Sequence, residues 1–227
     1  MHGGMAAGTY TWSLAQTPAV FIRNGLGLLY QSWMNDTSVA NSKNQLTRQF
    51  LDTQATHLMW IDADIAFSAQ DIVSMVSADQ DIVCGVCPRN AIDWERVAKA
   101  VRDDVPTAEL KSHVGSFEVK PIDGGTGSGS DALVEVAAAG AGFMLVKRGV
   151  IEGLAGNVPD YLVDGVTLKE FFTTGIDPET NEWVGADEYF CRVARSAGFK
   201  VYAAPWVHVN RTGPYTYDGQ LEPNWLT

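Results

Sequence analysis

The sequence predicts a single α/β domain in which helices flank a mostly parallel central sheet. Two observations lead to this prediction. Apolar runs and amphipathic segments alternate over residues 26–86 in the order strand, helix, strand, helix, strand, and this order favours parallel strands with helices packed on the sheet. The chain has 227 residues, 46% of them hydrophobic and 19% charged, which suits one domain with a substantial core.

The first half of the chain is expected to hold three strands and two helices. The predicted strands are residues 26–33, 57–61 and 82–86, which are short and largely apolar. Ser38 and Ser68 are placed to cap the two helices, because a serine hydroxyl can accept a hydrogen bond from the first free backbone N–H groups. Their core-facing positions are predicted to be Val39, Leu46, Phe50 and Leu51 in the first helix and Ile72, Val73 and Val76 in the second.

The second half begins with a predicted flexible excursion over residues 101–132, because residues 123–130 consist mainly of glycine and serine. Residues 157–183 are expected to be irregular and functional, since long loops in compact domains usually carry function. A helix is predicted to begin near Asp187 and to stop at Gly198. The remaining predicted strands are residues 133–136, 142–146 and 200–202.

Charge and composition exclude some classes of protein. The net charge is −11, from 16 basic and 27 acidic side chains, which opposes non-specific binding to nucleic acid. No apolar run approaches the roughly 20 residues that span a bilayer, and the N-terminus lacks the pattern of a signal peptide. The three cysteines are interpreted as structural thiols in a reducing compartment. We therefore expect a soluble, cytoplasmic protein with no membrane span.

The run Leu58–Ile61 leads directly into Asp62 and Asp64, two carboxylates one residue apart. Alternate strand residues point to the same side, so the two acids are expected to project together from the carboxyl end of the strand. Like charges held side by side repel unless a cation lies between them, and Mg²⁺ or Mn²⁺ prefers oxygen ligands of this kind. The simpler alternative is a turn that caps the next helix.

Five segments in this order resemble one family of enzymes. They are Asn44 after a basic residue in a helix, His57–Ile65 with its D-x-D triplet, Asp81–Gly85 leading to Pro88–Arg89, Gly140–Phe143, and Asp187–Arg192 followed by an aromatic tail at Trp206. Together, from about Val39 to about Gly219, they resemble nucleotide-sugar glycosyltransferases of GT-A fold, related to family 2 and found in bacteriophages. The resemblance implies a Rossmann-like sheet and a single domain over residues 1–227, with a nucleotide-binding half at 1–100 and an acceptor-binding half at 133–227.

The resemblance also implies an activity: transfer of a sugar from a nucleotide-diphosphate donor to an acceptor hydroxyl, assisted by Mn²⁺ or Mg²⁺. The acceptor would be a glycan, a virion protein or a hydroxymethylated DNA base, and the location would include the cytoplasm of a phage-infected bacterium. The implied roles are metal binding by Asp64, Asp62 and His208, donor binding by Asp62, Lys43, Gly3, Gly4 and Arg211, general base for Asp187, and acceptor binding by Trp183, Gly142 and Glu188.

Several alternatives stay open at the level of sequence. Ala186 stands where the family has a first carboxylate and Arg211 where relatives often have a metal-binding histidine, so a non-catalytic nucleotide- or carbohydrate-binding protein is one alternative. A nucleotidyltransferase is another, although Gly3 and Gly4 lack the basic residue that such a loop requires. Asp187 could simply cap its helix, and His208 could be a structural histidine.

Overall fold

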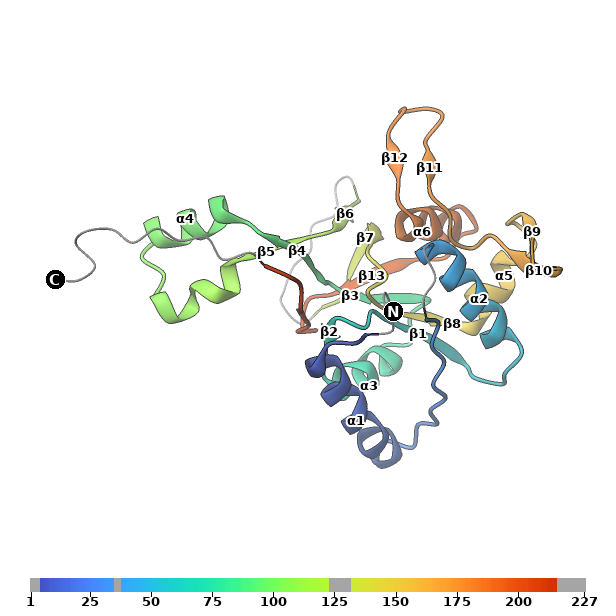
Figure 1. Ribbon diagram of the computed structural model, residues 1–227, viewed down its shortest axis with the longest axis horizontal. Helices are drawn as coiled ribbons and strands as arrows, with labels where there is room; N and C mark the ends of the chain where they lie inside the picture. Colours follow the sequence, from blue (N-terminus) through green and yellow to red (C-terminus); the bar gives the residue numbers. More distant parts are fainter. Residues whose placement is uncertain (1–4, 35–37, 123–131, 216–227) are drawn as a thin grey trace.

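The computed structural model describes residues 5–34, 38–122 and 132–215, which form a mixed α/β domain. A six-stranded sheet lies between two layers of helices (Figure 1). One layer holds α1 (Gly8–Arg23) and α3 (Ala69–Ser77), and the other holds α2 (Val39–Leu51), α5 (Arg148–Leu154) and α6 (Ala186–Ser196). Each layer has its own buried apolar cluster, built around Phe21, Ile72 and Met75 on one face and Phe50, Ile151 and Phe190 on the other.

The sheet is mostly antiparallel, so the prediction of a mostly parallel sheet is wrong. Its strand order is β1-β8-β3-β13-β7-β6, and only the pair β3–β13 is parallel. The strands are β1 (His57–Ile61), β8 (Phe143–Lys147), β3 (Ile82–Gly85), β13 (Val201–Ala204), β7 (Val134–Ala139) and β6 (Val119–Pro121).

The physical reason for this error lies in β8. Strands β1 and β3 both run antiparallel to β8, so they point in the same direction and are joined through α3, as the β-α-β pattern predicts. A strand from much later in the chain inserts between them and pairs with both. The local sequence pattern predicts the crossover connection between β1 and β3. It does not predict that a strand from a distant part of the chain lies between them.

The predicted helix signals within the described residues are confirmed. Ser38 accepts a hydrogen bond from the N–H of Asn41 at the start of α2, and Ser68 accepts one from Gln70 at the start of α3. Gly198 follows α6 with a positive φ of 91°, a conformation that favours glycine and ends the helix.

Residues 26–33 do not form the predicted strand. They lie in irregular structure after α1, a helix that the sequence patterns did not predict. Among the described residues no strand pairs with this segment, and an isolated extended segment has no ladder of hydrogen bonds to define it as a strand.

Three shorter units complete the fold. Residues 101–122, expected to be flexible, contain regular elements: residues 119–121 form β6 of the sheet, and residues 101–117 belong to an arm that projects from the sheet (Figure 1). The elements of the arm are β4 (Pro88–Ile92), α4 (Trp94–Arg102), the 3-10 helix η2 (Thr107–His113) and β5 (Gly115–Phe117). The loop expected over residues 157–183 instead holds two hairpins, β9–β10 (Asp160–Val163 and Val166–Lys169) and β11–β12 (Gly175–Ile176 and Trp183–Val184).

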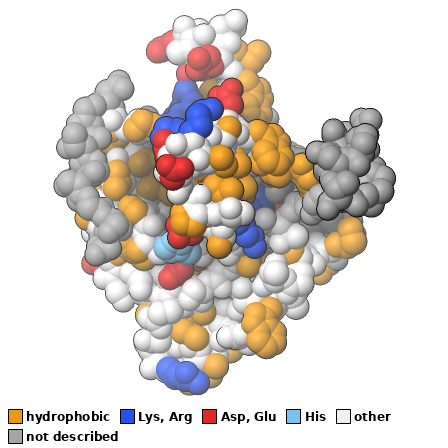
Figure 2. Space-filling view, turned by 90° about the vertical axis from the view of Figure 1, so that its left-hand side faces the viewer, with side chains coloured by type: hydrophobic (Ala, Val, Ile, Leu, Met, Phe, Trp, Pro, Cys, Tyr) orange, Lys and Arg blue, Asp and Glu red, His pale blue; other side chains and the backbone are white. Residues whose placement is uncertain are grey.

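The surface carries charges of both signs. On the face drawn in Figure 2, acidic and basic side chains lie interspersed with hydrophobic ones. None of the helices in the described residues has both the length and the apolar character that crossing a membrane requires.

Candidate functional site

The acid pair lies where β1 ends, beside a cation supplied by the C-terminal part of the chain. Strand β2 (Ile65–Ala66) follows the acids and pairs with β14 (Asn210–Arg211), so that Arg211 lies opposite Ile65. The N–H of Thr212 also donates to the Asp64 carbonyl, at 2.8 Å. This short ladder places the Arg211 guanidinium next to both carboxylates: Nη2 is 2.7 Å from Asp62 Oδ2, and Nε is 3.7 Å from Asp64 Oδ2.

Gly142 closes the other side of this cluster. Its carbonyl accepts a hydrogen bond from the N–H of Asp62, at 2.9 Å. A Cβ at this position would lie 2.7 Å from Arg211 Nη2 and 2.9 Å from Asp62 Oδ2, both closer than real Cβ contacts allow. A side chain at residue 142 would therefore have to displace the ends of the Arg211 and Asp62 side chains and disturb their ion pair.

Asp187 lies in the first turn of α6, but its carboxylate does not cap that helix. Oδ1 accepts from the ammonium of Lys43, and Oδ2 accepts from the N–H of Ala141 at 2.7 Å. Lys43 is 6% exposed, and its ammonium also lies 5.3 Å from the centre of the Phe172 ring. The carboxylate thus links α2, α6 and the tight turn between β7 and β8.

The charges of the site influence one another. Burial raises the pKa of Asp62, and the carboxylates of Asp187 and Asp64 raise it further, whereas the cations of Lys43 and Arg211 lower it. Cys87, whose sulfur would lie 3.3 Å from a Cβ on residue 142, has its pKa raised to about 12 by burial and by the negative charge of Asp62. The five charged groups therefore behave as one electrostatic cluster.

A cavity of about 1460 Å³ opens onto four of these five groups. Asp62, Asp64, Lys43 and Asp187 all line it. The rest of its lining is predominantly apolar and comes from α1, α2, β1 and residues 26–33. The site is therefore a charged end of a large cavity whose remaining walls are hydrophobic.

Two buried polar atoms of the cluster have no hydrogen-bond partner among the described residues: Asp64 Oδ1 and Arg211 Nε. Leaving such a group unpaired costs on the order of 1–3 kcal/mol, and functional sites are one setting in which the cost is tolerated. One atom is an acceptor and the other a donor, and they belong to side chains in contact. A cation bound to the carboxylate together with an anion bound to the guanidinium would satisfy both.

This donor set fits Mg²⁺ or Mn²⁺ when phosphate oxygens complete the shell. Among the described residues, no three His, Cys, Asp or Glu side chains gather as a metal cage. Mg²⁺ does not require one, since it is usually bound through one or two carboxylates plus substrate phosphates and water. Because Asp62 is already paired with Arg211, Asp64 is the stronger candidate for contact with the metal.

Three predicted site residues lie elsewhere. His208, predicted to bind the metal, contacts the Trp206 carbonyl at 3.1 Å, and its backbone N–H donates to Asp71 on α3. Trp183 is 69% exposed on the β11–β12 hairpin and is absent from the lining of this cavity. Glu188 is paired with Lys120 at 2.6 Å and with Arg192 at 2.7 Å. These residues are close to the motifs in the sequence, but their spacing gave no information on the direction in which their side chains point.

Gly3 and Gly4, predicted to bind the donor, lie outside the described residues. By contrast, the structure brings together Lys43, Asp62, Asp64, Gly142, Asp187 and Arg211 from five separate segments of the sequence. Ser68 rather than either acid accepts the capping hydrogen bond of α3, so the capping-turn alternative for Asp62 and Asp64 is wrong.

Sequence reasoning missed two members of the site. One is the backbone N–H of Ala141, which donates to Asp187. The run of small residues at 137–141 indicated that some group approaches the backbone closely, but it did not indicate which group. The other is Cys87, which was interpreted only as a structural thiol. Its position directly after β3, at the same edge as Asp62, could have indicated a place near the site.

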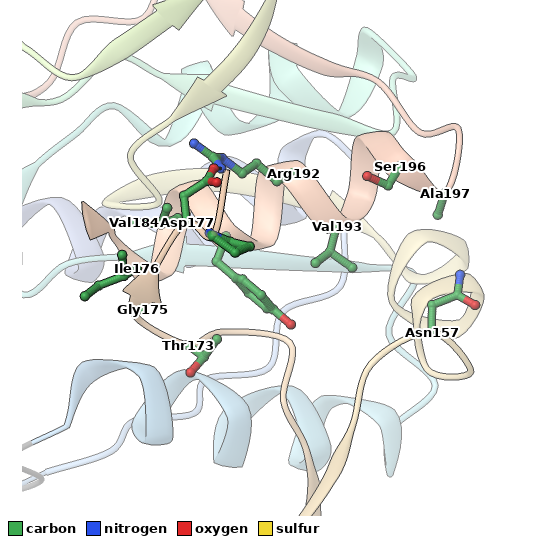
Figure 3. Close-up of a pocket in the computed structure, with 12 residues that line it drawn as sticks. Asn157, Thr173, Gly175, Ile176, Asp177, Val184, Arg192, Val193, Ser196 and Ala197 are labelled. Atoms are coloured by element: carbon green, nitrogen blue, oxygen red, sulfur yellow. Dashed lines mark hydrogen bonds and ion pairs between the residues drawn. The ribbon is translucent and has the colours of Figure 1, made fainter. Parts of the chain in front are cut away.

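A second, smaller cavity of about 530 Å³ lies on the outer face of α6 (Figure 3). Its lining includes Val193 and Ser196 from α6, Ala197 at the C-cap of that helix, and Gly175 and Ile176 from β11. The figure shows Asp177 and Arg192 turned toward each other, and they form an ion pair there. This cavity is separate from the acid pair, because neither Asp62 nor Asp64 is among its lining residues.

Comparison with known proteins adds little. No protein-family model matches the chain, and no curated protein matches it. Among solved structures, the crystal structure of A197 from STIV aligns with a TM-score of 0.46 and 14% identity, over 90% of this chain and 89% of that one. A TM-score below 0.5 supports no inference about a shared fold or function.

Proposed function

We propose that this protein transfers a sugar from a nucleotide-diphosphate donor to an acceptor hydroxyl with the help of a divalent metal. The observation that carries the proposal is the pair of buried atoms Asp64 Oδ1 and Arg211 Nε, which have no hydrogen-bond partner among the described residues and belong to side chains in contact, of which Asp64 lines the cavity. In a metal–diphosphate unit, the metal ion would bind the Asp64 oxygen and a phosphate oxygen would accept a hydrogen bond from Arg211 Nε. The GT-A resemblance of the sequence points to the same ligand.

The donor would be held at the acid pair. Asp64 would bind the metal, which, when present, neutralises charge on the departing diphosphate. Arg211 Nη2 would stay on Asp62, and Nε, which has no hydrogen-bond partner among the described residues, would donate to a phosphate oxygen. Asp62 is then fixed in orientation and can accept hydrogen bonds from hydroxyls of the ribose or the donor sugar through its remaining lone pairs. Gly142 leaves room for this arrangement.

Asp187 is the proposed general base. An acceptor hydroxyl is a poor nucleophile until a positioned carboxylate takes its proton. The Lys43 ammonium and the Ala141 N–H hold the Asp187 carboxylate in place in the first turn of α6. Each carboxylate oxygen has a second lone-pair site, so the base can receive an acceptor hydroxyl while both contacts remain.

The acceptor class remains a proposal among a glycan, a virion protein and a hydroxymethylated DNA base. The net charge of −11 and the mixed charges of the face in Figure 2 give no support to a broad DNA-binding surface there. A DNA acceptor would thus depend on a local basic contact.

A second candidate function is binding without catalysis, and one observation favours it. The Asp187 carboxylate is engaged at both oxygens, by Lys43 and by Ala141, before any substrate arrives. If these contacts hold the group as a structural link between α2 and α6, the protein would bind a nucleotide or carbohydrate without transferring it.

Calorimetry separates these functions. We expect at least one of UDP, GDP, CDP, ADP and dTDP to bind in the presence of Mn²⁺, and Asp64→Asn to weaken that binding at least tenfold. Asp187→Asn should keep the binding but abolish slow hydrolysis of the matching nucleotide sugar. Asp103→Asn, in an exposed ion pair with Lys99, is the matched control and should change neither. Binding of none of the five would overturn the proposal, and hydrolysis that survives Asp187→Asn would exclude Asp187 as the base.

A further inference from the structure

The smaller cavity lies on a face of α6 that points away from the acid pair. The helix lines this cavity with one stripe of residues three and four positions apart: Tyr189, Arg192, Val193 and Ser196. At 3.6 residues per turn, Asp187 lies about 200° around the helix from Tyr189. The volume of about 530 Å³ falls within the roughly 300–1,000 Å³ of ordinary small-molecule sites. The cavity therefore suits a compact ligand that does not contact the acid pair.

The charged side chains of this cavity are already paired. Asp177 and Arg192 are the acidic and basic residues of its lining, and they form an ion pair with each other (Figure 3). The Arg192 guanidinium also contacts Glu188 at 2.7 Å, and Glu188 in turn contacts Lys120 at 2.6 Å. A charged ligand would have to break one of these pairs to gain a partner. The electrostatics of the cavity thus favour a neutral ligand.

Four uncharged polar side chains surround the cavity, and none of them makes a side-chain hydrogen bond within the described part of the chain. They are Asn157, Thr173, Tyr189 and Ser196. Figure 3 shows Thr173, Asn157 and Ser196 around the cavity on three separate segments. Hydroxyl and amide groups both donate and accept hydrogen bonds. A ligand that displaced water from them without replacing its hydrogen bonds would bind at a cost, so a purely apolar ligand fits poorly.

Apolar side chains supply the rest of the surface. Val184 and Val193 line the cavity from β12 and α6, and Ile176 lines it from β11. Ile176 pairs across the hairpin with Trp183, and the two side chains are 68% and 69% exposed. Directly opposite residues of an antiparallel pair project to the same face, so Trp183 lies beside Ile176. The negative face of an aromatic ring attracts C–H groups that neighbouring oxygens have polarised.

We propose that this cavity binds a neutral saccharide, held through its hydroxyls by the four polar side chains and packed with its apolar face against Ile176 and Trp183. A sugar ring without an ionisable substituent has no charge, a rim of hydroxyls and a face of C–H groups. These are the three properties that the lining selects. The inference goes beyond the proposed function, because it assigns no reaction to this cavity. It also gives a role to Trp183, which does not line the larger cavity.

Nitrogen–proton correlation NMR tests the proposal, with no nucleotide or metal in solution. The methyl glycosides of glucose, galactose, mannose and N-acetylglucosamine are added one at a time. We expect at least one of them to shift the amide signals of Gly175, Ile176 and Ala197 in a saturable manner, while those of Asp62 and Asp64 stay unchanged. Methyl glucuronide keeps the ring but adds a carboxylate, and cyclohexanol keeps a six-membered ring with one hydroxyl. Both should bind at least tenfold more weakly.

Two variants test the contacts. Tyr189→Phe removes one hydroxyl and keeps the ring, and Trp183→Ala removes the exposed aromatic face. We expect each to weaken binding of the sugar at least threefold without changing the melting temperature. Trp94→Ala is the matched control, because Trp94 is 61% exposed on α4, outside the lining of this cavity. It should leave binding of the sugar unchanged.

Four results would overturn the proposal. None of the four glycosides shifts these amides, or the shifts appear at Asp62 and Asp64 instead. Methyl glucuronide or cyclohexanol binds as tightly as the best glycoside. Tyr189→Phe and Trp183→Ala both bind it like the parent protein. Trp94→Ala weakens binding as much as Trp183→Ala does. Because nucleotide and metal are absent throughout, a failure here leaves the proposed function to its own test.

Discussion

Lys43 and Asp187, which are 144 positions apart, form an ion pair that joins α2 to α6 at the charged end of the cavity. The lysine side chain is 8% exposed and the aspartate 31%, so water screens the pair only partly. Removing one partner of a buried pair leaves the other charge uncompensated, and the cost of that change exceeds the net contribution of the intact pair.

A double-mutant cycle measures this coupling. Because Asp187 is partly accessible, we expect Lys43→Met and Asp187→Asn each to lower the free energy of unfolding by roughly 1–3 kcal/mol, less than for a fully buried pair. The double variant should lose at least about 1 kcal/mol less than the sum of the two single losses. Urea denaturation gives the values. The exposed pair Lys99–Asp103 is the control and should couple by about 0.5 kcal/mol or less. Additive losses at Lys43 and Asp187 would contradict the structure.

A side chain at residue 142 should disturb the Arg211–Asp62 ion pair. We expect Gly142→Ala to displace Arg211 from Asp62, to destabilise the protein by about 1–3 kcal/mol through strain, and to weaken nucleotide–Mn²⁺ binding at least tenfold. Gly140→Ala is the matched control, since a Cβ at that position has nothing within 4 Å. Thermal denaturation and calorimetry of the two variants provide the comparison. Similar behaviour of both alanine variants would show that the close approach at residue 142 is absent.

Asn44 should matter for stability more than for binding. Its side chain accepts from the N–H of Phe172 and donates to the carbonyl of the same residue, each at 2.9 Å, and so replaces a strand partner in the buried interior. Asn44→Ala leaves both backbone groups of Phe172 without these hydrogen bonds, and we expect the free energy of unfolding, measured by urea denaturation, to fall by roughly 2–4 kcal/mol. Asn24→Ala, which removes one exposed hydrogen bond to Val20, should cost far less. Equal losses would argue against the buried role of Asn44.

Cys87 reports the electrostatics of the site through its pH dependence. With a pKa of about 12, only about one thiol in ten thousand is ionised at pH 8, so alkylation by iodoacetamide should be slow and should rise about tenfold per pH unit. Burial is the largest cause of the raised pKa, and the Asp62 carboxylate adds to it. Asp62→Asn removes a negative charge, so the thiolate becomes easier to form and the rate should increase by roughly threefold.

Mass spectrometry of the peptide that contains Cys87 measures these rates, and Cys84 and Cys191 are buried and should remain unmodified. Asp103→Asn serves as the control for a change of net charge, because Asp103 is an exposed residue paired with Lys99. A slower reaction in Asp62→Asn, or an equal acceleration in both variants, would contradict the arrangement described for the site.

The local parts of the fold could be predicted from the sequence. Ser38 and Ser68 cap their helices because a hydroxyl next to free N–H groups is a local arrangement. Strand β1 and the position of the acids at its end follow from a short apolar run. The helix before Gly198 is likewise local. In each case the interacting atoms lie within a few residues of one another, so the sequence pattern contains all of the information.

The arrangement of the site was decided by tertiary structure. The insertion of β8 between β1 and β3 depends on packing between distant segments, and it made the sheet antiparallel where the pattern indicated parallel. Arg211 reaches the acids through a two-residue ladder, whereas His208, three residues earlier, turns to α3. Residue spacing identifies which chemical groups are available. Only the folded chain determines which of them face each other, because that depends on contacts between segments that lie far apart along the sequence.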